Sequence, residues 1–172
     1  MKRVILSVFV LLFAACSTKN TVTNYTIDSD FTSRYKKDQT VGLSVEALPS
    51  LQSRKIYWQK GFEKNPYLYS QWIGDFDTLV KKSVYNALFK VYKGVYLDKK
   101  GDVNLKLFIT NAVHVVTGDS SYVILDIKAY VNGKTKEFHY KIPCARSAKS
   151  AVEAFNMAVG KFEKDLLEWL KG

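Results

Sequence analysis

Few residues in this chain have side chains that could carry chemistry: two cysteines, Cys16 and Cys144, and two histidines, His114 and His139. A cysteine and a histidine form a nucleophilic pair when the imidazole lies within hydrogen-bond reach of the thiol and the surroundings favour thiolate. Cys144 precedes a predicted helix and neighbours Arg146, which meets part of that requirement. Unpaired cysteines are also common as small buried apolar residues. We therefore predict that Cys144 is not catalytic and that the protein is not an enzyme.

Other patterns that hold metals or substrates are missing from the sequence. The histidines and Cys144 are scattered over predicted strands and lack the short spacings of metal sites. A glycine-rich phosphate loop, a His-Glu-x-x-His helix and a Gly-x-Ser-x-Gly elbow are all absent. Asp75 and Asp77 are explained as residues at the start of a helix. We expect no metal and no cofactor.

Cys16 differs from the other candidates, because it ends a segment ordered like an export signal. Two basic residues come first, an apolar run over residues 4–13 follows, and two alanines precede the cysteine. The run is too short to span a bilayer. A cysteine directly after small residues resembles the bacterial lipoprotein signal peptide, in which the thiol receives acyl chains such as palmitate. Phe13 stands where such signals usually carry Leu, and an ordinary cleaved signal is the alternative.

Removal of residues 1–15 would leave 157 residues (172 minus 15), with 24 basic residues (26 minus 2) against 16 acidic ones, a formal charge of +8. That length suits one domain with its own core. In an exported protein this charge favours anionic lipid head groups, glycolipid phosphates or an acidic protein surface as partners, and not nucleic acid. A merely solvated lysine-rich surface is the alternative. With Cys16 acylated, Cys144 has no partner for an intramolecular disulfide.

The order of hydrophobic patterns predicts the domain organisation. Residues 1–15 are a cleaved lipoprotein signal peptide, residues 16–24 a lipidated polar tether, and residues 25–172 a single α+β periplasmic domain. Strands are predicted at 25–27, 41–48, 55–59, 67–72, 103–110, 123–131 and 134–142, with a loop over 28–40. Asn132-Gly133 predicts a type I′ turn in the last hairpin. An amphipathic helix begins beside Asp77 and ends near Gly94, and Ser147 caps a terminal helix.

These elements predict an α+β fold. Its antiparallel sheet carries a long C-terminal hairpin meander, and both helices pack on one face, where a one-sided sheet offers them an apolar partner.

The stretch from residue 56 to 72 concentrates aromatic residues between turn formers. They are Tyr57, Trp58, Phe62, Tyr67, Tyr69 and Trp72. Tyrosine and tryptophan combine apolar area with a polar group, which suits protein interfaces and the boundary of a lipid bilayer. We predict that this segment contacts a partner or the membrane. The alternative is that part of it fills the core.

At this segment the chain resembles the auxiliary lipoproteins of ABC-type intermembrane transport systems, the group that includes the Pqi-system lipoprotein. The likeness covers about residues 25–92 and rests on elements in a fixed order. These are Tyr25-Thr26-Ile27, Leu48-Pro49, Ile56-Tyr57, Tyr67, Trp72 and a helix with Leu79, Val84 and Leu88.

The resemblance implies an ABC transporter auxiliary component in lipid transport, anchored in the outer membrane on the periplasmic side. The protein would dock on or complete a bridge across the periplasm that includes a permease, an ATPase and a tunnel protein. The resemblance also allows the protein to form a homo-oligomer. Ser17, after the cysteine, fits sorting to the outer membrane. The alternative function is a stand-alone outer-membrane lipoprotein that binds a ligand or helps to insert glycolipid or a barrel protein.

Overall fold

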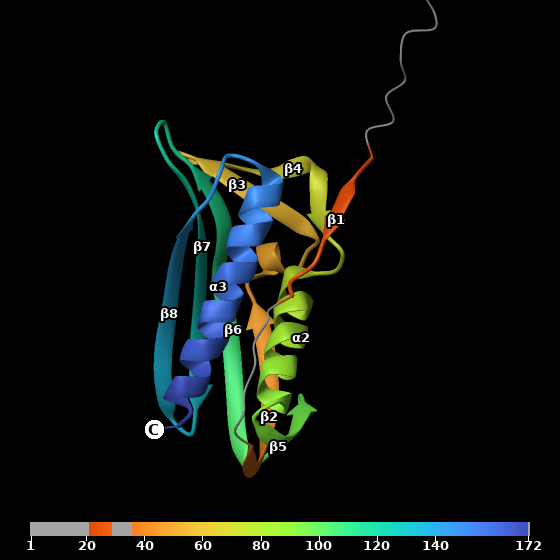
Figure 1. Cartoon of the computed structure of the whole chain (residues 1–172), viewed down its shortest axis with the longest axis vertical. Coiled ribbons are helices and arrows are strands. Elements are labelled where there is room, and N and C mark those ends of the chain that lie inside the picture. Colours follow the sequence, from red (N-terminus) through yellow and green to blue (C-terminus); the bar gives the residue numbers. More distant parts are fainter. Residues whose placement is uncertain (1–20, 29–35, 172) are drawn as a thin grey trace, which may run out of the picture.

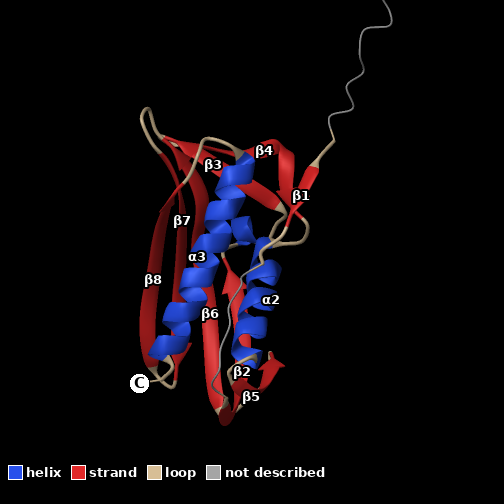
Figure 2. Cartoon of the chain, in the orientation of Figure 1, coloured by secondary structure: helices blue, strands red, loops and turns tan. Residues whose placement is uncertain are grey.

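The computed structural model describes residues 21–28 and 36–171, which form one sheet with helices packed on it (Figures 1 and 2). Cys16, the predicted signal peptide and most of the predicted tether lie outside the described residues. The strands are β1 (Thr23–Tyr25), β2 (Lys37–Ala47), β3 (Lys55–Lys60), β4 (Glu63–Trp72), β5 (Tyr92–Leu97), β6 (Val103–Val116), β7 (Ser121–Val131) and β8 (Lys134–Pro143). The helices are α2 (Phe76–Phe89), α3 (Ala148–Trp169) and the short 3-10 helix η2 (Pro49–Leu51).

The long strand β6 organises the sheet. On one side it pairs along its length with β7, which pairs in turn with β8, and both pairings are antiparallel. On its other side β6 pairs in parallel first with β2 and then, near its end, with β3. Beyond these lie β5, parallel to β2, and β4, antiparallel to β3 and parallel to β1. The strands β2 and β3 therefore follow one another along the same edge of β6.

Both helices cover the same face of the sheet (Figure 2). The helix α2 packs on β2 and β5, and α3 packs on β7 and β8, because each turns an apolar stripe toward the sheet. The two helices also contact each other, and the hydroxyl of Ser83 donates a hydrogen bond of 2.6 Å to the buried Glu163 carboxylate. The predicted α+β fold class, with its C-terminal meander and its helices on one face, is confirmed.

Two local predictions are confirmed by backbone geometry. Asn132 and Gly133 both have positive φ angles, 49° and 78°, as a type I′ turn requires. The hydroxyl of Ser147 accepts a hydrogen bond of 3.2 Å from the backbone N–H of Ser150, which caps α3.

The first helix and the first strand have different bounds from those predicted. The helix α2 ends at Phe89, and the predicted endpoint Gly94 lies within β5, a strand that the sequence patterns did not indicate. Residues 92–97 form a strand and not a continuation of the helix because they pair with the edge of β2. This pairing provides hydrogen-bond partners for β2 and buries Tyr92. The strand β1 begins at Thr23, so the domain starts within the predicted tether.

A β-bulge divides β6 and exchanges the faces of its side chains. The register with β7 shifts between Ile109 and Asn111, so Ile109 lies opposite Ile127 whereas Ala112 lies opposite Leu125. An extra residue in one strand of an antiparallel pair reverses the alternation beyond it. His114 is therefore turned onto the buried face, where it is fully inaccessible to solvent.

Candidate functional site

The β3–β4 hairpin, which carries the predicted aromatic segment, lies across the upper end of the molecule in Figure 1. Lys60 pairs with Glu63, so Gly61 and Phe62 form a two-residue turn. Gly61 has a φ of 59° and Phe62 has no positive φ, which is the φ pattern of a type II′ turn with glycine at its first central position. The turn leaves the Phe62 side chain fully exposed at the tip, at 109% of its reference area.

The six predicted contact residues do not share one environment, and Trp72 belongs to the core. Its side chain is 2% exposed, and its ring lies 5.3 Å from that of Phe76 and 5.8 Å from that of Phe155. Trp72 ends β4 on the face that both helices cover, so it packs between α2 and α3. The prediction that Trp72 contacts a partner is thus corrected.

Three more members of the set are half-buried. The ammonium of Lys64 lies 5.3 Å from the centroid of the Tyr57 ring, a cation–π contact across the hairpin. Trp58 lies beside His114 in the register of β3 with β6. Tyr67 reaches over β3 to contact the same histidine. These residues fix the hairpin to the sheet and leave Phe62 and Tyr69 as its exposed aromatic members.

The exposed part of the hairpin also includes aliphatic residues that the sequence interpretation missed. Leu68 is 79% exposed and Tyr69 is 51% exposed, and β1 places the exposed Val22 near Tyr69, because Thr23 pairs with Ser70. Three consecutive apolar residues at 67–69 break the alternation of a half-buried strand, which is the signal that could have found them. We call Phe62, Leu68, Tyr69 and Val22 the hairpin surface.

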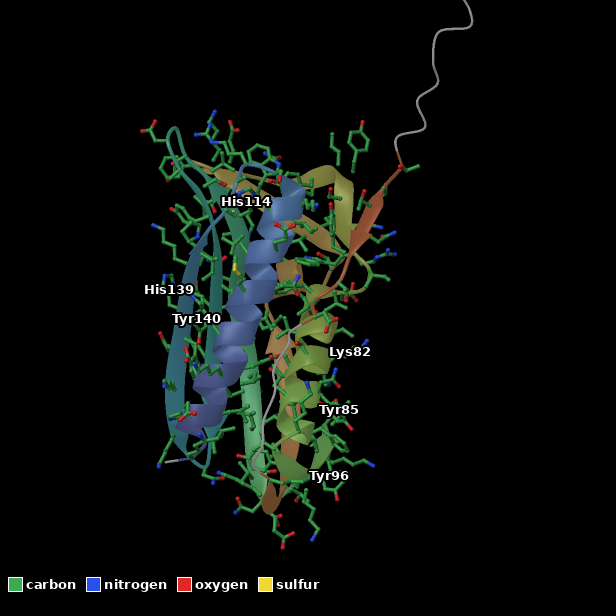
Figure 3. The ribbon with its side chains drawn as sticks, in the orientation of Figure 1. Lys82, Tyr85, Tyr96, His114, His139 and Tyr140 are labelled. Atoms are coloured by element: carbon green, nitrogen blue, oxygen red, sulfur yellow. The ribbon has the colours of Figure 1, made fainter. Side chains whose placement is uncertain are left out.

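A buried chain of polar groups anchors the hairpin. The Tyr67 hydroxyl lies 2.6 Å from Nδ1 of His114, and Nε2 of His114 lies 2.5 Å from Oγ of Ser121. Ser121 in turn is 3.5 Å from the carbonyl oxygen of Ala145 and 3.8 Å from Sγ of Cys144. Figure 3 shows His114 at the same end of the molecule as the hairpin.

The protonation states of these groups follow from burial. Loss of solvent lowers the pKa of His114 and raises the pKa of Tyr67 to about 12, so the imidazole is neutral and the phenol keeps its proton. Tyr67 then donates to Nδ1, Nε2–H donates to Ser121, and Ser121 donates to the Ala145 carbonyl. Every donor in this chain has an acceptor, which is the arrangement of a structural network and not of an activated serine.

The structure brings His114 and Cys144 to the same serine and not to each other. Burial raises the pKa of the Cys144 thiol, whereas a nucleophilic cysteine needs a lowered one. His139 lies on β8, where its Nδ1 is 2.5 Å from Oδ1 of Asp126 across the β7–β8 ladder (Figure 3). The described residues therefore do not assemble the cysteine and histidine pair that the sequence raised.

A second exposed apolar cluster lies at the opposite end of the molecule. Tyr85 and Tyr96 mark it in Figure 3. Tyr85 stacks on Phe89 with ring centroids 5.9 Å apart, and Phe89, Tyr96 and Leu97 are all exposed. We call these four residues the distal patch. It is built from α2 and from β5, which forms an edge of the sheet.

Within residues 21–28 and 36–171, no group of three or more histidine, cysteine or acidic side chains is placed to hold a metal ion. In the same part of the chain no helix has the length and apolar character needed to cross a bilayer.

Comparison with known proteins identifies the fold. Protein XCC0632 from Xanthomonas campestris, a solved structure of the DUF330 family, superposes with a TM-score of 0.77 at 15% sequence identity, covering 86% of this chain and 94% of that one. A second solved structure, described as an uncharacterized protein, has a TM-score of 0.64 at 10% identity over 87% of this chain and 99% of that chain. No family model and no curated protein matches the sequence. The chain thus has the fold of these two proteins over nearly their whole length.

Proposed function

We propose that this protein is a lipid-anchored periplasmic accessory component of an ABC-type intermembrane lipid transport system. It is held at the outer membrane by acyl chains on Cys16 and docks or completes the bridge between the membranes. The Pqi-like auxiliary lipoproteins that the sequence resembles supply the functional class. The fold shared with a DUF330 protein is compatible with the proposal but does not select it.

One geometric observation carries the proposal: the chain enters the folded domain at the end where the hairpin surface lies. The strand β1 begins at Thr23, only seven positions after Cys16 (23 minus 16), and it pairs with the end of β4. A domain tethered at this end presents the hairpin toward the bilayer and projects the distal patch away from it (Figures 1 and 3). The distal patch is then available to a partner protein in the periplasm.

Two hollows on the described surface lack the form of a lipid-carrying site. One, of 230 Å³, lies between β2 and the β5–β6 loop and is lined by several polar and charged residues, among them Asp98 and Lys106. Another, of 310 Å³, lies between β8 and α3 beside Asp165 and Glu168. Sites for apolar ligands are deep and lined mainly by apolar side chains. Both hollows are open to solvent and lined by mixed polar and apolar groups, so neither is a deep apolar site for an acyl chain.

The test uses the full chain in its native cells. We expect metabolic labelling with a palmitate analogue to mark the wild-type protein and not a Cys16→Ser variant, and the label to fractionate with the outer membrane. A photo-crosslinking residue at Phe89, in the distal patch, should join the protein to a permease, ATPase or tunnel component. The same residue placed at Met157, exposed on α3, is the matched control.

Two results would contradict the proposal. One is a wild-type protein that does not incorporate the palmitate analogue, which would exclude the lipid anchor and favour an ordinary cleaved signal peptide. The other is a labelled protein that crosslinks to no transport component from any exposed position, which favours the stand-alone outer-membrane lipoprotein.

A further inference from the structure

We infer that the hairpin surface is a second membrane contact, in which Phe62 and Leu68 enter the interfacial layer of a bilayer that carries anionic lipids. This inference builds on the anchor in the proposed function, but it assigns to the hairpin itself an affinity for lipid that needs no acyl chain. The juxtaposition behind it is a fully exposed phenylalanine at a hairpin tip, an apolar stretch of edge strand, and the entry point of the chain.

Two apolar side chains of this surface, Phe62 and Leu68, are left uncovered by the part of the chain that the structure describes. Phe62 projects from the turn with its whole area exposed, and Leu68 is 79% exposed. Single exposed apolar residues are ordinary, whereas several at one end of a small domain mark a surface that another phase or partner covers. Tyr69 adds an amphipathic ring of the kind that is enriched at the boundary between acyl chains and water.

Basic side chains frame this surface. Lys60 and Lys64 flank the tip on both strands, with Glu63 as the acidic residue between them. At the same end Arg146 donates a hydrogen bond to the carbonyl of Gly118 and so ties the β8–α3 loop to the β6–β7 turn. Lysines beside an apolar tip reach the phosphate layer with their ammonium groups while the tip lies deeper.

The tether decides which end of the domain meets the bilayer. Five residue steps separate Cys16 from Thr21, the first described residue, and five steps span at most about 18 Å. The 14 residues of β6 run along the molecule and extend it by about 46 Å at about 3.3 Å per residue. An orientation with the distal patch on the bilayer and the hairpin farthest from it exceeds the reach of the tether. The hairpin end is the one held at the surface.

A protein strand added to the free edge of β4 is the competing occupant, and the edge itself disfavours it. Over residues 63–69 β4 has β3 as its one described strand partner, because β1 pairs with it only from Ser70 to Trp72. Pro66 lies within that free stretch and lacks an N–H, which interrupts the row of donors that an added strand would use. Binding to a lipid surface does not require a continuous row of backbone N–H donors.

The test measures binding of the unlipidated chain, from residue 16 onward with Cys16→Ser, to vesicles. This chain contains every described helix and strand. The vesicles are phosphatidylcholine alone or phosphatidylcholine with one-third phosphatidylglycerol. We expect the chain to bind the vesicles that contain phosphatidylglycerol. Phe62→Ser and Leu68→Ser should each weaken this binding about tenfold, because each removes one apolar side chain that enters the bilayer. Phe89→Ser, in the distal patch, is the matched control and should bind as the parent chain does.

The charge contribution is tested separately. Lys60→Gln and Lys64→Gln should each weaken binding about fivefold on the anionic vesicles alone, and high salt should remove that difference. Circular dichroism confirms that each variant is folded, since all these side chains are exposed. The inference is overturned if the parent chain does not bind vesicles, or if Phe62→Ser binds as tightly as Phe89→Ser. Neither outcome bears on crosslinking to transport components, so the two proposals can fail independently.

Discussion

Truncation to alanine should strongly destabilise the protein at one aromatic residue of the hairpin, Trp72, and leave its stability almost unchanged at another, Phe62. Trp72→Ala removes an indole that is 2% exposed and packs against the rings of Phe76 and Phe155. A buried Trp or Phe truncated to Ala costs about 3–5 kcal/mol, through lost burial and the cavity left behind. Phe62→Ala removes a ring that stays fully exposed in the folded protein and so buries no area on folding, and its cost is within about 0.5 kcal/mol.

Urea denaturation and thermal melting of the Cys16→Ser chain measure both variants. For a domain of this size about 1 kcal/mol shifts the melting temperature by about 2–4 °C, so Trp72→Ala should melt at least about 6 °C below the parent. Phe62→Ala should melt within about 2 °C of it. If Trp72→Ala cost less than about 1 kcal/mol, or if Phe62→Ala cost more, the division of the segment into core and surface would be refuted.

Three further predictions concern other parts of the fold. Burial lowers the pKa of His114 from 6.5, so the free energy of unfolding should fall as the pH drops below 6.5, and the His114→Gln variant should lose this dependence in urea titrations at each pH. Gly42→Ala should cost about 1–3 kcal/mol, because its Cβ would lie 2.2 Å from a backbone oxygen of the β5–β6 loop, whereas Gly118→Ala, with open space around it, should be neutral in the same assay. Ser147→Ala should cost about 1 kcal/mol by removing the cap of α3, measured by urea denaturation.

Local patterns predict the C-terminal half of this protein well. The β7–β8 turn depends on Asn132-Gly133, whose backbone preference is intrinsic, and α3 begins at Ser147, whose hydroxyl meets a neighbouring N–H three residues on. Such signals operate within a few residues and depend little on distant parts of the chain. The strand β5 had no comparable signal, because its six residues are stabilised by pairing with β2, about 50 positions earlier in the chain.

The buried network of Tyr67, His114, Ser121 and Cys144 also depends on tertiary structure and has no local sequence signal. Tyr67, His114, Ser121 and Cys144 come from β4, β6, β7 and the segment after β8, and their separations in sequence carry no recognisable spacing. A bulge in β6 turns His114 inward, and the alternation pattern alone places no bulge there. The histidine therefore becomes a packing and hydrogen-bonding residue, although its chemistry made it a candidate for catalysis.

The sequence by itself determines the α+β fold class, because composition and periodicity report which residues need burial and where the chain turns. It also singles out residues 56–72 as unusually rich in aromatic side chains. Tertiary structure alone decides that Trp72 lies in the core and Tyr67 is half-buried against it, while Phe62, Leu68 and Tyr69 remain at the surface. The physical reason is that burial depends on which elements cover a face, and here α2, α3 and β6 cover one part of the hairpin and leave its tip and free edge uncovered.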